Sequence, residues 1–249
     1  MCFEWIYQTE RYKERDKTPS ENNGFASTVA DAFRRGGRKM GLVLGIFKPE
    51  LSEFQKKKLL YEFSTFFDLN KDGTLEWHDF EMARQKICDM SGWQVGSPRY
   101  LHTHELFKEI WRKLQDDGDE NFDGKISKEE WIKMWQTFHK QHLEQLKKRK
   151  DDVTTEPSLP VWLEKYIEYK FNLLDRTGNG FVDVEEYEYV MAEFGIPPKQ
   201  ARNAFTMFSV NNDRKVDMEY FRHLCTEYYR SDDPSSLGNF INGKLDFTD

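Results

Sequence analysis

One stretch of twelve residues, from Asp119 to Glu130, constrains this chain more than any other. It reads DENFDGKISKEE, with oxygen-bearing side chains at positions 1, 3, 5 and 12, glycine at position 6 and an aliphatic residue at position 8. Short carboxylate and amide side chains at this spacing can surround one hard cation, and the glycine permits the sharp turn between them. The stretch therefore predicts a cation-binding loop between two helices.

This spacing is that of an EF-hand calcium loop, in which the carbonyl of position 7 and a bidentate glutamate at position 12 complete the ligand set. The aliphatic residue at position 8, Ile126, is expected to pair with the same position of a partner loop. The expected ligands are Asp119, Asn121, Asp123, the carbonyl oxygen of Lys125, and Glu130.

A second loop with the same spacing spans residues 68–79 and ends on aspartate instead of glutamate. Because Asp79 is one methylene shorter, we expect it to bind through one oxygen, and Glu76 at position 9 to compensate by reaching the ion directly. This loop should bind calcium more weakly or accept six-coordinate magnesium. Its expected ligands are Asp68, Asn70, Asp72, Thr74, Glu76 and Asp79.

A third loop spans residues 175–186 and carries fewer charges, with Asp183 expected to act through water. Its expected ligands are Asp175, Thr177, Asn179, the carbonyl oxygen of Phe181, and Glu186. A fourth unit, 209–220, has Ser209, Arg214 and Tyr220 at positions 1, 6 and 12, so we expect an empty loop. Its retention is explained by loop pairing, with Val216 beside Val182.

Each loop lies between segments whose apolar residues recur at helical spacing. The predicted fold is all-α: four EF-hands in two paired lobes, with short two-stranded antiparallel β ladders between paired loops. Ser52 and Gln55 predict a capping box at the start of the first helix. A helix over about 100–115 should precede the second loop, and Gly195 should end the helix after the third.

The expected organisation is an N-terminal extension at 1–50, a first EF-hand pair at 51–145, a linker at 146–160, a second pair at 161–230 and a tail at 231–249. The extension contains a predicted short helix at 28–35 and a basic patch at 34–39. It is interpreted either as a flexible tail or as an arm that docks on an acidic membrane surface or partner, helped by acylation of Cys2. The apolar residues of the tail predict that it folds back into the cleft of a lobe.

Composition limits the classes of partner and function that suit this chain. The formal net charge is -7, which argues against nucleic acid as a partner. The chain has 20 Phe and only 8 Met, which favours a core of rings with limited opening over a Met-rich target groove. Scattered cysteines, no apolar run long enough to span a bilayer and no signal-peptide core predict a cytoplasmic protein, which we expect to be monomeric.

The region from Glu53 to the C-terminus resembles calexcitin, a neuronal relative of the invertebrate sarcoplasmic calcium-binding proteins. The similarity is carried by DLNKDGTLEWHDFE (68–81), KEEWIKMW (128–135), SLPVWLEKY (158–166), FGIP (194–197) and CTEYY (225–229). The aspartate that ends the first loop and the empty fourth loop match the same pattern. The resemblance implies a compact pair of EF-hand lobes, three metal sites and a cytosolic role in calcium signalling or buffering. We expect a calcium sensor or buffer and not an enzyme, with any protein target unknown.

Two alternatives stay open. Insect juvenile hormone diol kinase is similar to the same family, so a small-molecule kinase is one, and GNFINGK (238–244) has the spacing of a phosphate-binding P-loop. However, Leu245 stands where the magnesium-binding Ser or Thr of that motif belongs. The other alternative is a carrier for an apolar ligand in the ring-lined interior.

Overall fold

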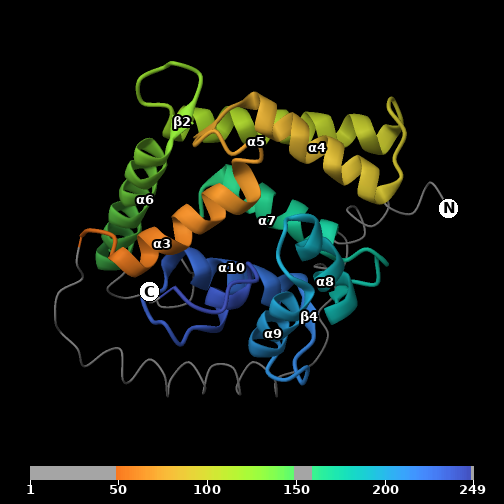
Figure 1. Cartoon of the computed structure of the whole chain (residues 1–249). Coiled ribbons are helices and arrows are strands. Elements are labelled where there is room, and N and C mark those ends of the chain that lie inside the picture. Colours follow the sequence, from red (N-terminus) through yellow and green to blue (C-terminus); the bar gives the residue numbers. More distant parts are fainter. Residues whose placement is uncertain (1–48, 149–158, 248–249) are drawn as a thin grey trace, which may run out of the picture. The chain divides into compact units, whose positions relative to one another are not determined.

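The computed structural model describes residues 49–148 and 159–247, so the predicted helix at 28–35, the basic patch, Cys2 and most of the predicted linker lie outside the described residues. The first half contains two helix–loop–helix units (Figure 1). The first unit comprises α3 (Glu53–Glu62), η1 (Phe63–Phe67), β1 (Thr74–Leu75) and α4 (Trp77–Ser91). The second comprises α5 (Pro98–Gly118), β2 (Ile126–Ser127) and α6 (Lys128–Lys148).

Two further units of the same kind form the second half and are followed by a short 3-10 turn. The third unit comprises α7 (Val161–Leu174), β3 (Phe181–Val182) and α8 (Val184–Glu193). The fourth comprises α9 (Pro198–Phe208), β4 (Val216–Asp217) and α10 (Met218–Arg230), and the turn is η2 (Leu237–Phe240). Within the described residues, no helix is long and apolar enough to cross a membrane.

The loops pair as the sequence predicts. Strands β1 and β2 are antiparallel with Leu75 opposite Ile126, and β3 and β4 are antiparallel with Val182 opposite Val216. All four side chains are buried, because the eighth residue of each loop points from the ladder into the core. The all-α EF-hand fold with two small ladders is thereby confirmed.

Helix boundaries follow the local caps, with two differences from the expected ones. Ser52 Oγ accepts a hydrogen bond from Gln55 N, but both polar atoms of the buried Gln55 side chain lack a partner among the described residues. Only half of the predicted capping box therefore forms. Helix α5 is longer than predicted at both ends, since Pro98 suits a first helical position and Ser97 caps it.

A π-helical turn interrupts the entry to the first loop. It spans Phe63–Phe67, where helical spacing alone predicts a continuous α-helix, and it buries Phe63, Phe66 and Phe67 together. The wider turn changes the rotation between successive residues and so brings three rings toward one core. The predicted helix is correct in extent but not in winding.

The core is a continuous network of rings shared by both halves. Trp131, at the start of α6, lies with its ring centroid 5.6 Å from that of Phe63 and 6.2 Å from that of Trp162 on α7. Its indole N–H donates to the carbonyl of Leu59 at 3.1 Å, and the side chain has no exposed surface. One residue of the second unit thus fixes α3 and α7 together.

The C-terminal tail joins the two halves. Tyr187 on α8 donates from its hydroxyl to Ile241 O at 3.0 Å, and Gln200 on α9 donates to Gly243 O at 2.7 Å. Phe247 reaches α3, where it meets Phe54 edge to face at 6.2 Å. The tail folds back as expected, but it spans helices of both halves, whereas the sequence predicts occupation of a single lobe's cleft.

A buried lysine anchors the start of the tail. Lys58 on α3 has no exposed surface and donates from Nζ to Ser231 O at 2.7 Å and Asn239 Oδ1 at 2.9 Å. The rings of Phe54 and Tyr228 lie 5.0 and 5.4 Å from the amine. Burial lowers the pKa of Lys58 to about 7, because the charged form loses its hydration.

Candidate metal centre

Backbone amides of loop 68–79 donate hydrogen bonds to its first and last carboxylates and so fix the shape of the loop. Asp68 accepts from the amides of Asp72 and Gly73, each at 3.1 Å, so both carboxylate oxygens face the loop interior. Asp79, which has almost no exposed surface, accepts from Leu69 N at 3.0 Å. It also accepts from Glu76 N at 3.0 Å, so one carboxylate ties the end of the loop to its beginning and to the helix start.

The side chain of Glu76 forms an ion pair with the paired loop. Its carboxylate is 3.1 Å from Lys125 Nζ, which belongs to the paired loop. Lys125 thus points its charge at a neighbouring acid while its carbonyl remains available as the seventh-position donor. The sequence did not reveal this ion pair, although both residues were separately expected at the site.

Loop 119–130 repeats the first half of this arrangement. Asp119 accepts from Asp123 N at 3.1 Å and from Gly124 N at 3.0 Å, and Asn121 Oδ1 accepts from Asp123 N at 2.8 Å. Gly124 has φ +84°, a conformation that favours glycine. Glu130 Oε2 accepts from Ser127 N at 2.9 Å, which starts α6. The structure therefore orients this carboxylate with the helix cap.

A glutamine outside the predicted set touches this loop. Gln115, one turn before the loop on α5, donates from Nε2 to Asp119 Oδ2 at 3.2 Å. A spacing of four residues along a helix end is the signal that could have identified it. We assign it the role of orienting the first carboxylate.

Loop 175–186 closes through its last residue. Asp175 accepts from Asn179 N at 3.0 Å and Gly180 N at 2.9 Å. Glu186, which is buried, accepts from Thr177 N at 2.8 Å through one oxygen and from Asp183 N at 3.1 Å through the other. The backbone N–H of Phe181 donates to Asn179 Oδ1 at 2.8 Å. The carbonyl oxygen of Phe181 is the expected metal ligand of position 7.

The fourth loop has a different interior. Arg214, at the sixth position, lies with its guanidinium 3.5 Å from the ring centroid of Tyr220 at the twelfth. Tyr220 donates from its hydroxyl to Phe208 O at 2.7 Å, and the buried Ser209 accepts from Asn212 N at 3.1 Å. A cation and a ring thus occupy the positions that hold glycine and an acidic residue in the other three loops.

The donor chemistry of the first three loops fits a hard divalent cation. Within residues 49–148 and 159–247, no three His, Cys, Asp or Glu side chains gather closely enough to hold a metal by themselves. Each loop also carries amide, hydroxyl or backbone carbonyl oxygens beside its carboxylates, a donor set that suits calcium and does not suit softer metals. Burial raises the pKa of Asp79 and of Asp175, because the charged carboxylate loses part of its hydration there.

The segment 238–244 is not arranged as a phosphate-binding loop. Gly238 N donates to Glu227 Oε2 at 2.9 Å, so a carboxylate already occupies the amide that a phosphate would need. A Cβ on Gly238 would lie 2.3 Å from Leu224 O, which shows that this glycine permits close contact with α10. The P-loop spacing noted in the sequence therefore has a packing explanation.

These loops and their pairing have the architecture of EF-hand proteins. The family model described as EF hand matches residues 116–135 and 169–191, which cover the second and third loops. The chain is a homologue of the sarcoplasmic calcium-binding proteins and of calexcitin at about 25 % identity.

Particular relatives cover most of the chain. Sarcoplasmic calcium-binding proteins I, III and IV of Branchiostoma lanceolatum are 26 % identical over 78 % of this chain and 98 % of the relative. Calexcitin-1 of Caenorhabditis elegans is 27 % identical over 80 % of this chain and 90 % of its own length.

Solved structures show the same fold. The sarcoplasmic calcium-binding protein from amphioxus has a TM-score of 0.63 at 24 % identity, covering 78 % of this chain and 98 % of the other. The calcium-regulated photoprotein mitrocomin from the jellyfish Mitrocoma cellularia has a TM-score of 0.51 at 17 % identity, with coverages of 80 % and 97 %. The resemblance stated from the sequence is confirmed.

Proposed function

We propose that this protein binds calcium in loops 68–79, 119–130 and 175–186 and acts in the cytoplasm as a buffer or as a sensor with a small conformational response. The observation that carries the proposal is the same in all three loops. The first aspartate accepts two backbone amides of its own loop, so its oxygens are oriented before any ion arrives. Such pre-orientation lowers the entropic cost of binding.

Limited opening is supported by the tail. Ile241 and Phe247 are both buried, and the hydrogen bonds described above connect the tail with α3, α8, α9 and α10. A sensor that exposes a broad target groove would have to release these contacts. The Phe-rich core adds to this, since rings adapt to new partners less readily than methionine.

Loop 68–79 is the proposed site of lower calcium selectivity. Asp79 is short, and Glu76 would have to leave its ion pair with Lys125 to reach an ion. A smaller coordination number suits magnesium, which prefers six oxygen ligands. We infer that millimolar magnesium competes here first.

Calorimetric calcium titration of the full chain tests the proposal. Glu130→Gln and Glu186→Gln each replace one carboxylate oxygen by an amide nitrogen, and each should weaken one binding event by at least about tenfold, or about 1.4 kcal/mol. Their matched controls are Glu129→Gln and Glu185→Gln, which alter the neighbouring exposed glutamates.

Three binding events in the parent chain, with one lost in each test variant and none in either control, are the expected result. Absence of calcium binding to the parent chain refutes the proposal. A fourth event that disappears on a Ser209→Ala change would contradict the assignment of loop 209–220 as empty.

A further inference from the structure

The fourth loop, 209–220, closes without the two carboxylates that begin and end the other loops. The buried Ser209 stands at its first position, and its carbonyl oxygen accepts from Arg214 N at 3.0 Å. In each of the other three loops, the amide at position 6 donates to the carboxylate of the first aspartate. The hydrogen bond from position 6 back to position 1 is therefore kept, while the charge that attracts a cation is missing.

Tyr220, the last residue of the fourth loop, makes the closing contact that an acid makes elsewhere. In loops 68–79 and 175–186, the carboxylate at position 12 accepts from an amide near the beginning of its own loop. The hydroxyl of Tyr220 instead donates to Phe208 O at 2.7 Å, and burial raises the pKa of Tyr220, so the hydroxyl keeps its proton. The guanidinium of Arg214 lies 3.5 Å from the centroid of the same ring, where the cation and the ring face attract each other.

The closed fourth loop contacts loop 175–186 along the β ladder. In this ladder Val216 lies opposite Val182, and Asp217 lies opposite Phe181. Lys215 Nζ also lies 4.6 Å from the centroid of the Phe181 ring. Because the carbonyl oxygen of Phe181 is the expected ligand of position 7, the fourth loop holds the backbone at one of the metal donors of its partner.

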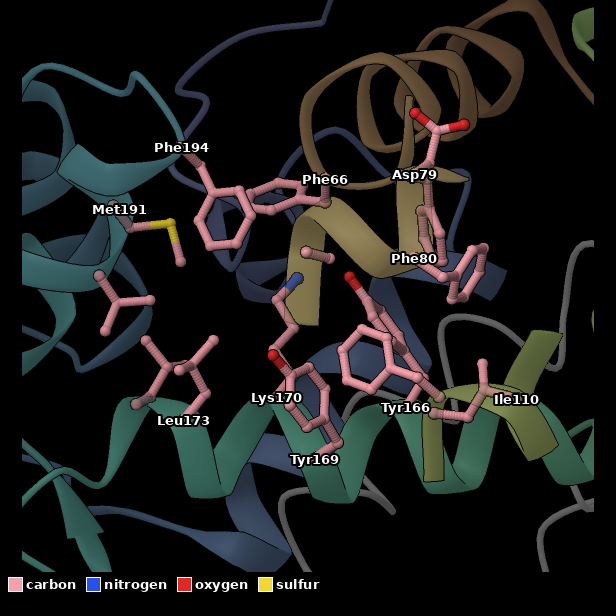
Figure 2. A pocket seen from close by; sticks show the side chains of 15 residues that line it. Phe66, Asp79, Phe80, Ile110, Tyr166, Tyr169, Lys170, Leu173, Met191 and Phe194 are labelled. Carbon is pink, nitrogen blue, oxygen red and sulfur yellow. The ribbon is translucent and has the colours of Figure 1, made fainter. Parts of the chain in front are cut away.

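The helix that enters loop 175–186 is fixed as well. Lys170 on α7 donates from Nζ to Asn242 Oδ1, and this nitrogen lies 4.3 Å from the ring centroid of Phe66. Figure 2 shows Tyr169 and Lys170 rising from α7 into an apolar pocket. The pocket measures about 30 Å³, room for about one water molecule, so the side chains around it are closely packed. Loop 175–186 therefore lies between a fixed entry helix and a closed partner loop.

The first pair of loops is built differently. Asp68 and Asp79 begin and end one of its loops, and Asp119 and Glu130 begin and end the other. Each of these loops thus faces a partner with the carboxylates of a cation site. Loop 119–130 is paired with loop 68–79 and not with the fourth loop, so it is an internal reference for any effect of the fourth loop.

We propose that Arg214 and Tyr220 are positioning residues for the calcium site in loop 175–186. They hold the fourth loop closed without an ion, and the closed loop keeps the Phe181 carbonyl in place through the ladder. A donor that is already in place lowers the entropic cost of binding, so this pair of side chains raises the calcium affinity of a site that neither of them touches. The inference rests on the proposed function of loop 175–186.

Calcium titration of the isotope-labelled full chain, followed by NMR, tests this proposal loop by loop. The amides of Gly180 and Gly124 report loops 175–186 and 119–130, because each donates to the first aspartate of its own loop. Arg214→Met removes the cation and keeps an unbranched side chain, so calcium binding reported by Gly180 should weaken at least about threefold. The titration of Gly124 should stay as in the parent chain.

Conservative variants distinguish positioning from a general loss of stability. Arg214→Lys keeps a cation for the ring and should bind calcium at loop 175–186 more tightly than Arg214→Met. Tyr220→Leu removes both ring and hydroxyl and should weaken that site at least about tenfold, whereas Tyr220→Phe keeps the ring and should fall between Tyr220→Leu and the parent. The control is Lys199→Met, at an exposed lysine of α9. Circular dichroism shows whether each variant folds.

Closure of the fourth loop has a readout that needs no calcium. With chelator present, the amide of Arg214 should exchange slowly with solvent, because it donates to Ser209 O. In Tyr220→Leu the same amide should exchange at least about tenfold faster, since the contact that closes the loop is lost.

The outcomes separate this inference from the proposed function. Parent-like affinity at Gly180 in the folded Arg214→Met and Tyr220→Leu variants, or equal weakening at Gly180 and Gly124, overturns the positioning role. Rapid exchange of the Arg214 amide in the parent chain overturns the closure of the fourth loop. If that amide is protected but Gly180 of the parent does not respond to calcium, the proposed site in loop 175–186 is refuted while the closure stands.

Discussion

Removal of the Phe247 side chain is the sharpest test of the tail's structural role. The ring is 3 % exposed and meets Phe54 at 6.2 Å, Tyr61 at 5.5 Å and Tyr228 at 6.2 Å, each edge to face. Lys244 Nζ lies 4.9 Å from its centroid. Truncation of a buried Phe to Ala typically costs about 3–5 kcal/mol. Because the ring is close to the chain end, where the backbone can relax, we expect Phe247→Ala to cost about 3 kcal/mol.

The assay is equilibrium unfolding in urea, followed by tryptophan fluorescence and circular dichroism. Calcium must be held fixed, once with chelator and once in excess, because ion binding to the folded state adds stability by mass action. The variant should also bind more of an apolar dye, since the rings of Phe54, Tyr61 and Tyr228 lose their cover.

The matched control lies two residues away. Leu245 is 40 % exposed, so Leu245→Ala should change the free energy of unfolding by no more than about 0.5 kcal/mol. If Phe247→Ala costs no more than Leu245→Ala and does not raise dye binding, the tail is not a structural element and the reasoning from burial is wrong.

Three further predictions concern other parts of the fold. Gly238→Ala places a Cβ 2.3 Å from Leu224 O and should cost about 1–3 kcal/mol in urea unfolding, through displacement of η2 from α10. Ile126→Ala, at a side chain with no exposed surface, should cost about 2–5 kcal/mol and weaken calcium binding in calorimetry at both loops joined by β1 and β2. Lys58→Met should flatten the pH dependence of the free energy of unfolding between about pH 7 and 10. In that range a lysine of the unfolded chain keeps its proton, whereas folded Lys58 has released it. Lys58 therefore makes the parent chain more stable as pH rises, by at most about 1.4 kcal/mol per pH unit.

Each of these variants has a control on an exposed position. Lys57→Met changes the neighbouring exposed lysine on α3 and should keep the parent's pH slope. Val161→Ala, at a residue 63 % exposed, is the counterpart of Ile126→Ala, and Ser235→Ala is that of Gly238→Ala. An unchanged pH slope in Lys58→Met, or equal losses in a variant and its control, would contradict the corresponding argument.

The loops were readable from the sequence because their chemistry is local. The alternation of oxygen donors, the sixth-position glycine and the eighth-position aliphatic residue are all fixed within twelve residues, and the register of Leu75 with Ile126 follows from them. The entry and exit helices were equally predictable, since apolar residues at helical spacing must share one face. The ligand sets remain predictions that metal binding must test.

Contacts between distant residues were decided only by the tertiary structure. The Glu76–Lys125 ion pair depends on two loops meeting, and the position of the tail depends on helices of both halves. The π turn at Phe63–Phe67 buries three rings in a core whose other members lie far away in the sequence, so a short segment of sequence does not predict it.

The sequence by itself thus determined which loops carry oxygen ligands for a cation and how those loops pair, because both properties arise within short segments. Only the tertiary structure decided that Lys58 loses its hydration, that Phe247 closes against α3, and that Tyr169 faces an apolar pocket without a partner. Burial is a property of everything that surrounds a side chain, and those surroundings come from residues far away in the chain.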